Sequence, residues 1–218
     1  MNNLSTRALR IACVIGIGVV TSLSPATAEE DSRFTGEAVD VAFLSEALTL
    51  PSFRVFNRPV HPGAMAAYER PWKTFDRSYL FIEINAGFYL HEGFQNGVFL
   101  GVDVGYNYAT SVGLGASVSV GVGYLHTFFP GPVYEHSDGE FEQVRDYGMP
   151  HLVVSVPLEI HYNLETLVGI PLTPYVQYRP FVEVPGITGW GIHALPHASI
   201  LVGTKVHLDT AENRGGAL

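Results

Sequence analysis

Nine histidines are the side chains of this sequence best suited to chemistry. His151 and His197 each open a segment of alternating polar and apolar residues, and Glu183 closes another. If these segments are neighbouring strands, the three side chains point to the same face. Two imidazoles and a carboxylate can ligate a divalent metal, and they can also form an acid–base pair. We therefore predict a metal site at His151, Glu183 and His197.

Composition excludes several classes of protein. The chain has 218 residues, of which 47% are apolar and only 15% charged, and its net charge is −9. A negative chain without a basic cluster is not a nucleic-acid binder by charge. One cysteine cannot form an internal disulfide, and disorder requires low hydrophobicity. The many glycines and aromatic residues favour β structure.

The first residues have the pattern of an export signal. Arg7 and Arg10 precede an apolar run over 11–20, and small residues follow as far as Ala28. This order is typical of a secretory signal peptide, so we expect residues 1–28 to be removed near Ala28. The apolar run is too short for a comfortable membrane span. Cys13 lies inside it, which leaves an exported chain without cysteine.

The apolarity of the remaining chain has a period of two. From Ser78, even positions such as Leu80, Ile82 and Ile84 are aliphatic, and odd positions include Glu83 and Asn85. Six segments follow this pattern, and their polar face holds Gly, Ser, Asn and single charges with almost no Lys. Each segment has about 11 to 13 residues, whereas globular strands have about 5 to 6 and membrane strands about 9 to 11. The pattern favours membrane strands over the alternative, a soluble β-sandwich.

Counting the segments gives the predicted fold. Two weaker segments precede the six, so we expect strands at 52–57, 63–72, 78–91, 97–109, 112–127, 151–163, 173–183 and 197–208. The fold class is all-β, a transmembrane antiparallel up-and-down barrel of eight strands, an even number as in bacterial single-chain barrels. The long connections at 128–150 and 185–196 follow odd strands and are expected outside.

The predicted domain boundaries follow from these strands. Residues 51–208 are the barrel and residues 209–218 a C-terminal tail. We expect residues 29–50 to be a periplasmic leader, with a short amphipathic helix over 39–48.

The interior of an eight-stranded barrel is just wide enough for side chains to fill. Inward-facing charges must therefore pair, because isolated buried ions cost several kcal/mol each. The residues we place in this lumen network are Arg54, Glu69, Glu83, Asp103, Glu159, Arg179 and Lys205. We expect a closed lumen. The alternatives are a proton or ion path and a narrow channel for small apolar molecules; a general porin needs about 16 strands.

The signal peptide, strand count, dyad repeat and loop lengths resemble the small eight-stranded bacterial outer-membrane barrel class. The spacing of certain residues is also similar to a family of uncharacterised bacterial barrels. Those residues are Asn57, Gly63, Glu69, His91-Glu92-Gly93, Tyr106, Leu125-His126-Thr127 and Leu195-Pro196-His197-Ala198. The resemblance implies a monomer in the bacterial outer membrane, inserted by the barrel assembly machinery, in contact with membrane lipid and lipopolysaccharide but not with nucleic acid. The chain departs from the class because a tail follows the last strand.

Two kinds of outer-membrane enzyme offer a comparison. Lipid A deacylases use a His, a Ser two residues later and a later Glu, but Thr127 follows His126 and no barrel Glu follows Ser199. Acyltransferases use His, Ser and Asp from loops, and here residues 136–138 are adjacent in a segment that reads as a turn. We therefore expect a non-enzymatic barrel with a structural or surface-binding role. A lipid-modifying enzyme is the alternative.

We expect no cofactor other than a divalent metal at the outer rim. The alternative to that metal site is that the histidines are polar tips at the membrane interface.

Overall fold

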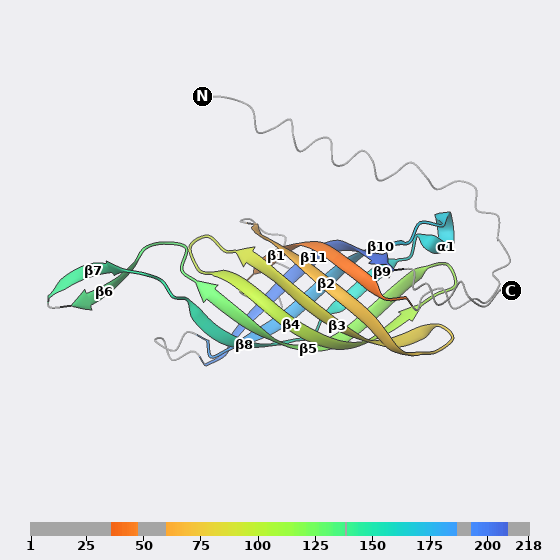
Figure 1. The fold of residues 1–218 in the computed structure, drawn as a ribbon, viewed down its shortest axis with the longest axis horizontal. Coiled ribbons are helices and arrows are strands. Elements are labelled where there is room, and N and C mark those ends of the chain that lie inside the picture. The colour runs from red at the N-terminus through yellow and green to blue at the C-terminus, as the bar shows by residue number, and fades with distance from the viewer. Residues whose placement is uncertain (1–35, 48–59, 138, 187–192, 209–218) are drawn as a thin grey trace, which may run out of the picture. The chain divides into compact units, whose positions relative to one another are not determined.

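The computed structural model describes residues 36–47, 60–137, 139–186 and 193–208. Within these residues the chain forms a closed antiparallel barrel (Figure 1). Seven wall positions are single strands: β1 (Ala38–Ala47), β2 (His61–Thr74), β3 (Ser78–Leu90), β4 (Asn96–Ala109), β5 (Leu114–Phe128), β10 (Leu172–Val184) and β11 (Leu195–His207). The eighth position, between β5 and β10, holds two shorter strands, β8 (Met149–Ser155) and β9 (Leu158–Tyr162).

The break between β8 and β9 has a local cause. Pro157 has no N–H to donate to the ladder, so the strand pairing is interrupted there. The neighbouring strands β5 and β10 still bond to the residues at the break. The Ser119 N–H of β5 donates to the Pro157 carbonyl at 3.0 Å, and the Val156 N–H donates to the Pro180 carbonyl of β10 at 3.0 Å. β8 and β9 therefore act as one wall strand.

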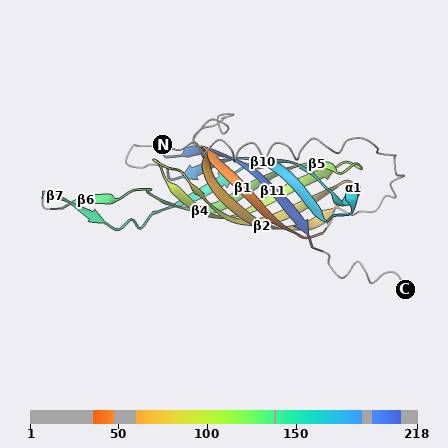
Figure 2. The ribbon, with the colours of Figure 1, turned by 90° about the horizontal axis from the view of Figure 1, so that it is seen from above.

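The barrel closes between its first and last strands. β1 pairs with β2 on one side and with β11 on the other, and Figure 2 shows β1 and β11 side by side. Closure leaves the wall without an unpaired edge. Connections leave the barrel at two ends. At one end, which we call the long-loop end, lie the ends of β1, β3, β5 and β10 and the starts of β2, β4, β8 and β11; the other, the short-turn end, carries 75–77, 110–113 and 163–171.

Two small elements lie in the connections. β6 (Val133–Ser137) and β7 (Glu140–Val144) pair only with each other, as a separate two-stranded sheet in the segment after β5. The helix α1 (Glu165–Val168) is a single turn between β9 and β10. No helix among the described residues is long and apolar enough to cross a membrane.

The structure confirms the antiparallel eight-stranded barrel and corrects its first strand. Residues 38–47 form β1, so the predicted amphipathic helix over 39–48 is wrong, and the barrel begins inside the segment assigned to the leader. The strand predicted at 52–57 lies outside the described residues. The helix prediction failed because Ala42 and Leu44 point inward between outward Val41 and Phe43. Their continuous apolar run hides the period of two.

The outer face of the barrel is apolar. Aliphatic and aromatic side chains stand exposed on it, with 57% of Phe43 in β1 and 61% of Val120 in β5 accessible. The alternation of buried and exposed residues along each long strand puts these side chains on one face and the buried charges on the other. Apolar side chains therefore face outward and charged side chains face inward, which is the reverse of a water-soluble protein.

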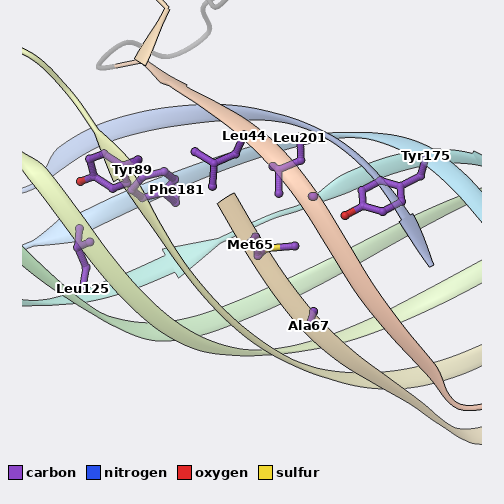
Figure 3. Close-up of a cluster of buried hydrophobic side chains, with 9 residues drawn as sticks. Leu44, Met65, Ala67, Tyr89, Leu125, Tyr175, Phe181 and Leu201 are labelled. Atoms are coloured by element: carbon purple, nitrogen blue, oxygen red, sulfur yellow. The ribbon is translucent and has the colours of Figure 1, made fainter. Parts of the chain in front are cut away.

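Besides its charged residues, the interior contains an apolar layer, which Figure 3 shows. Nine buried residues form it: Ala42, Leu44, Met65, Ala67, Tyr89, Leu125, Tyr175, Phe181 and Leu201. In the register of β1 with β11, the Leu44–Leu201 pair lies between Glu46–Ser199 and Asp40–Lys205. Beside these two strands, apolar side chains therefore separate polar residues at the long-loop end from polar residues deeper in the lumen.

Candidate functional site

The deeper polar residues form a network that we call the central ion-pair network. Its charged members are Glu69, Glu83, Asp103, Glu159, Arg179 and Lys205, and all are buried. The Arg179 Nη2 lies 2.7 Å from Asp103 Oδ2 and 3.2 Å from Glu83 Oε1. The Lys205 Nζ lies 2.8 Å from Glu69 Oε2 and 2.9 Å from Glu159 Oε1. Each cation therefore bridges two carboxylates that come from different strands.

These six residues belong to the lumen network we predicted, and the seventh, Arg54, lies outside the described residues. Neutral donors complete the network, and the sequence reasoning did not identify them. The Tyr79 hydroxyl donates to Glu69 at 2.8 Å, and the Asn85 amide donates to Asp103 at 3.0 Å. Such donors matter because buried carboxylates are costly unless their lone pairs are satisfied.

A second polar group, which we call the rim cluster, lies at the long-loop end. Its members are Glu46, His61, His91, His151, Glu183 and His197, all of them buried. Histidines and carboxylates alternate in it. His91 Nδ1 lies 2.6 Å from Glu46 Oε2, and Glu46 Oε1 lies 2.7 Å from His197 Nδ1. His197 Nε2 lies 3.1 Å from Glu183 Oε2, whose other oxygen lies 3.0 Å from His151 Nδ1.

The structure brings the predicted metal residues His151, Glu183 and His197 together. Their polar atoms, however, are already hydrogen-bonded. His151 Nδ1 also lies 2.6 Å from the Pro185 carbonyl, and its Nε2 lies 2.9 Å from Thr127 Oγ1. Both nitrogens of His197 face carboxylates. The three residues form a hydrogen-bonded chain, and metal binding by this set stays a prediction.

Glu46 is the member of the rim cluster that sequence reasoning missed. It connects His91 with His197, so the cluster depends on it. The sequence prediction places residues 29–50 in a leader, so Glu46 is not among its site residues. The signal that would have found it is the alternation of Asp40, Ala42, Leu44 and Glu46 with outward Val39, Val41 and Phe43.

Acidic groups outnumber permanent cations in the interior. Among the described residues, seven carboxylates are buried against two cations, Arg179 and Lys205. The carboxylates are Asp40, Glu46, Glu69, Glu83, Asp103, Glu159 and Glu183. Carboxylates that are ionised only accept hydrogen bonds. Because His197 lies between two of them, both of its nitrogens donate when both carboxylates are ionised, and its ring then supplies a positive charge.

Two cavities reach into the described interior. One, of about 50 Å³, lies near Tyr89, Phe181 and Arg179, and the other, of about 10 Å³, lies near His161 and Lys205. A cavity needs about 10 to 15 Å³ of this kind of volume to hold one water molecule. Arg179 and Lys205 are paired with carboxylates in this same part of the protein.

The deacylase-like pair His197 and Ser199 lies inside the barrel. Ser199 is buried, and His197 bonds to Glu46 and Glu183 on its two nitrogens. The other candidate, His126, bonds to the Tyr124 hydroxyl at 2.7 Å and the Tyr147 carbonyl at 2.9 Å. Neither histidine is arranged to activate a serine, since both of its nitrogens are engaged elsewhere.

Comparisons with solved structures return outer-membrane proteins. The chain is similar to Neisserial surface protein A (NspA), with 10% identity over 79% of this chain and 96% of that one, and a TM-score of 0.46. It is similar to Ail, the attachment invasion locus protein of Yersinia pestis, with 9% identity, 79% and 99% coverage, and a TM-score of 0.46. It is also similar to the outer membrane enzyme PagL, with 9% identity, 78% and 99% coverage, and a TM-score of 0.43. No protein-family model matches the sequence, and no curated protein matches it. The fold itself, a closed eight-stranded antiparallel barrel with an apolar exterior and a polar interior, is that of small outer-membrane barrels.

Proposed function

We propose that the protein is an integral outer-membrane barrel with a closed interior and a structural role. The observation that carries this proposal is the exposed aliphatic face around the wall. In water, contiguous apolar surface beyond a few hundred Å² is rare on a monomeric protein. In a bilayer the same surface is covered by lipid, and the polar interior is shielded from it.

Aromatic side chains at both ends of the wall support this placement. At the short-turn end, Trp72 and Phe75 are exposed beside the turn after β2, and Tyr106 is exposed near the end of β4. At the long-loop end, Tyr124 and Phe128 are exposed near the end of β5. Membrane barrels carry girdles of aromatic residues at the two interfaces, and these exposed aromatic residues lie at the two ends of the wall where such girdles are expected.

The partners we propose are those of a protein in this membrane. The outward face contacts lipid and lipopolysaccharide, and the barrel assembly machinery inserts the chain after export and cleavage near Ala28. We propose a monomer, because β1 and β11 close the wall within one chain.

The test has two parts. In a Gram-negative host the protein is expected in the outer-membrane fraction, resistant to carbonate extraction, with a gel mobility that changes on heating. Purified protein in planar bilayers is expected to give no discrete conductance steps, because Arg179 and Lys205 are paired across the lumen. Recovery in the soluble periplasm would overturn the membrane placement.

Each alternative has its own readout. Discrete conductance steps from the parent would show that the lumen opens and would favour the narrow channel. A changed lipid A profile in cells that express the parent would favour a lipid-modifying enzyme, and a Ser199→Ala variant that restores the profile would identify the nucleophile. The proposal expects unchanged profiles from parent and variant alike.

A further inference from the structure

Three residues of the rim cluster converge at the mouth of the barrel. Glu46 ends β1, His61 begins β2, and His91 directly follows β3. Glu46 and His61 are direct partners in the β1–β2 register. The β2–β3 register pairs Gly63 with Tyr89, which brings His91 level with His61. One possible ligand atom from each of the three lies within 4.8 Å of the others.

We propose that Glu46, His61 and His91 form a binding site for a divalent transition metal of the Zn²⁺ class. This site goes beyond the structural role proposed above and does not depend on it. It differs from the set His151, Glu183 and His197, whose nitrogens are engaged in hydrogen bonds.

His61 and His91 share one protonation pattern. His61 Nδ1 lies 3.0 Å from the Glu46 carbonyl oxygen, which only accepts, so His61 donates from Nδ1. His91 Nδ1 lies 2.6 Å from Glu46 Oε2 and donates to the ionised carboxylate in the same way. A neutral ring with its proton on Nδ1 has its lone pair on Nε2. Glu46 thus holds both imidazoles in the tautomer that ligates through Nε2.

This arrangement is the one that metal-bound histidines adopt. A ligating histidine nearly always donates its other N–H to a carboxylate or a backbone carbonyl. Glu46 supplies one acceptor of each kind, to His91 and to His61 respectively. Among the described residues, no hydrogen-bond partner is found for Nε2 of either ring, which leaves both lone pairs for a metal.

The two histidine rings pack against each other. His61 and His91 stack with centroids 3.4 Å apart and an interplanar angle of 19°. His61 Nδ1 faces the Glu46 backbone carbonyl and His91 Nδ1 faces its carboxylate, so Nε2 of each ring points away from these acceptors. The side chains are largely buried but not sealed, with relative exposures of 9% and 8%. A metal ion can therefore reach them from the long-loop end.

Other buried groups hold the Glu46 carboxylate in place. Its second oxygen accepts from His197 Nδ1 at 2.7 Å, and His197 stacks on Phe181 with centroids 4.6 Å apart. His197 is in turn fixed by Glu183, which also accepts from Gln95 at 2.9 Å. The carboxylate is thus held in place by a chain of buried groups, as outer-shell partners of metal sites are.

The donor types select the class of metal. Imidazole nitrogens suit Zn²⁺, Cu²⁺ and Ni²⁺, whereas Ca²⁺ and Mg²⁺ prefer carboxylate, carbonyl and water oxygens. We therefore expect Zn²⁺ to bind and Mg²⁺ not to compete.

The experiment is a titration of the folded, untagged protein in detergent with Zn²⁺ alone, followed by calorimetry. The parent is expected to bind one Zn²⁺ per chain, and a thousandfold excess of Mg²⁺ is expected to leave binding unchanged. His61→Gln and His91→Gln are each expected to weaken binding at least tenfold. Glu46→Gln is expected to weaken it by about 10- to 100-fold, the range for outer-shell partners. Heat-dependent gel mobility checks that each variant is folded.

The matched controls are His151→Gln in the rim cluster and His136→Gln in β6, both expected to bind Zn²⁺ within threefold of the parent. X-ray absorption of the zinc-loaded parent is expected to show nitrogen and oxygen ligands with two imidazoles, a measurement that needs no variant. A parent that does not bind Zn²⁺ would overturn the proposal. So would binding that survives in the His61 and His91 variants, or that is lost in the His151 variant.

Discussion

Lys205 offers the most direct test of what holds the interior together. Its Nζ lies 2.8 Å from Glu69 and 2.9 Å from Glu159, and only 3% of its side chain is exposed. Lys205→Met keeps most of the volume and removes the charge, which leaves two buried carboxylates without their cation. Removing one partner of a buried ion pair costs about 3–5 kcal/mol. Because Tyr79 still donates to Glu69, we expect a loss of about 4 kcal/mol in the free energy of unfolding.

The measurement is equilibrium unfolding in urea of the protein in lipid vesicles, followed by tryptophan fluorescence. Lys73→Met is the matched control, because Lys73 is exposed near the end of β2 and a surface change of this kind is expected to stay within about 0.5 kcal/mol. Adding Glu159→Gln to Lys205→Met is expected to recover part of the loss, with a coupling of about 0.5–3 kcal/mol for residues in contact.

Two results would refute this reasoning. One is a Lys205→Met variant that loses no more stability than the Lys73→Met control. The other is a double variant whose loss is the simple sum of the two single losses. Either result would mean that packing of the apolar layer, and not the central ion-pair network, stabilises the lumen.

Three further perturbations test other parts of the structure. Gly121→Ala is expected to lower the free energy of unfolding in urea by about 1–3 kcal/mol, because a Cβ there overlaps the Asp103 carboxylate. The control Gly131→Ala has open space around it and is expected to leave that free energy unchanged. Equal effects of the two variants would contradict the packing around Gly121. Val120→Arg on the outer face is expected to cost about 2–4 kcal/mol in vesicles if that position lies near the bilayer midplane. The loop control Phe141→Arg is expected to change nothing, so equal losses would count against lipid contact. Replacing residues 132–145 by a short Gly-Ser linker is expected to leave unfolding unchanged, because β6 and β7 pair only with each other; a large loss would show that the hairpin supports the barrel.

Most strands of the barrel wall could be predicted from the sequence, because outward-facing aliphatic residues recur at every second position. The strand predicted at 78–91 is observed at Ser78–Leu90, and the strand predicted at 97–109 at Asn96–Ala109. Parity also placed Glu83 and Asp103 inside, since it fixes the face of a side chain. β1 was missed because Ala42 and Leu44 give it an apolar inner face, and an apolar run of four residues fits a helix as well as a strand.

The sequence alone does not show which residues contact each other. Parity gives the face of a strand but not the register between strands, so it could not show that Arg179 reaches Asp103, 76 residues away. The rim cluster illustrates the same limit. His151, Glu183 and His197 were predicted to converge from their positions at the ends of neighbouring strands. The role of Glu46 required knowing that β1 lies between β2 and β11.

The seam between β1 and β11 has a consequence for folding kinetics. Polar contacts of β1, β2 and β11 join residues far apart in the chain: Glu46 with His197 are 151 residues apart, and Glu69 with Lys205 are 136 apart. Proteins dominated by such distant contacts fold slowly, because the entropy of closing long loops is lost before those contacts form. Until the last strand docks, Glu46 and Glu69 lack these partners, and an open sheet has little stability of its own. We expect one dominant barrier at closure, and a native barrel whose lifetime is set by the rate at which that seam opens.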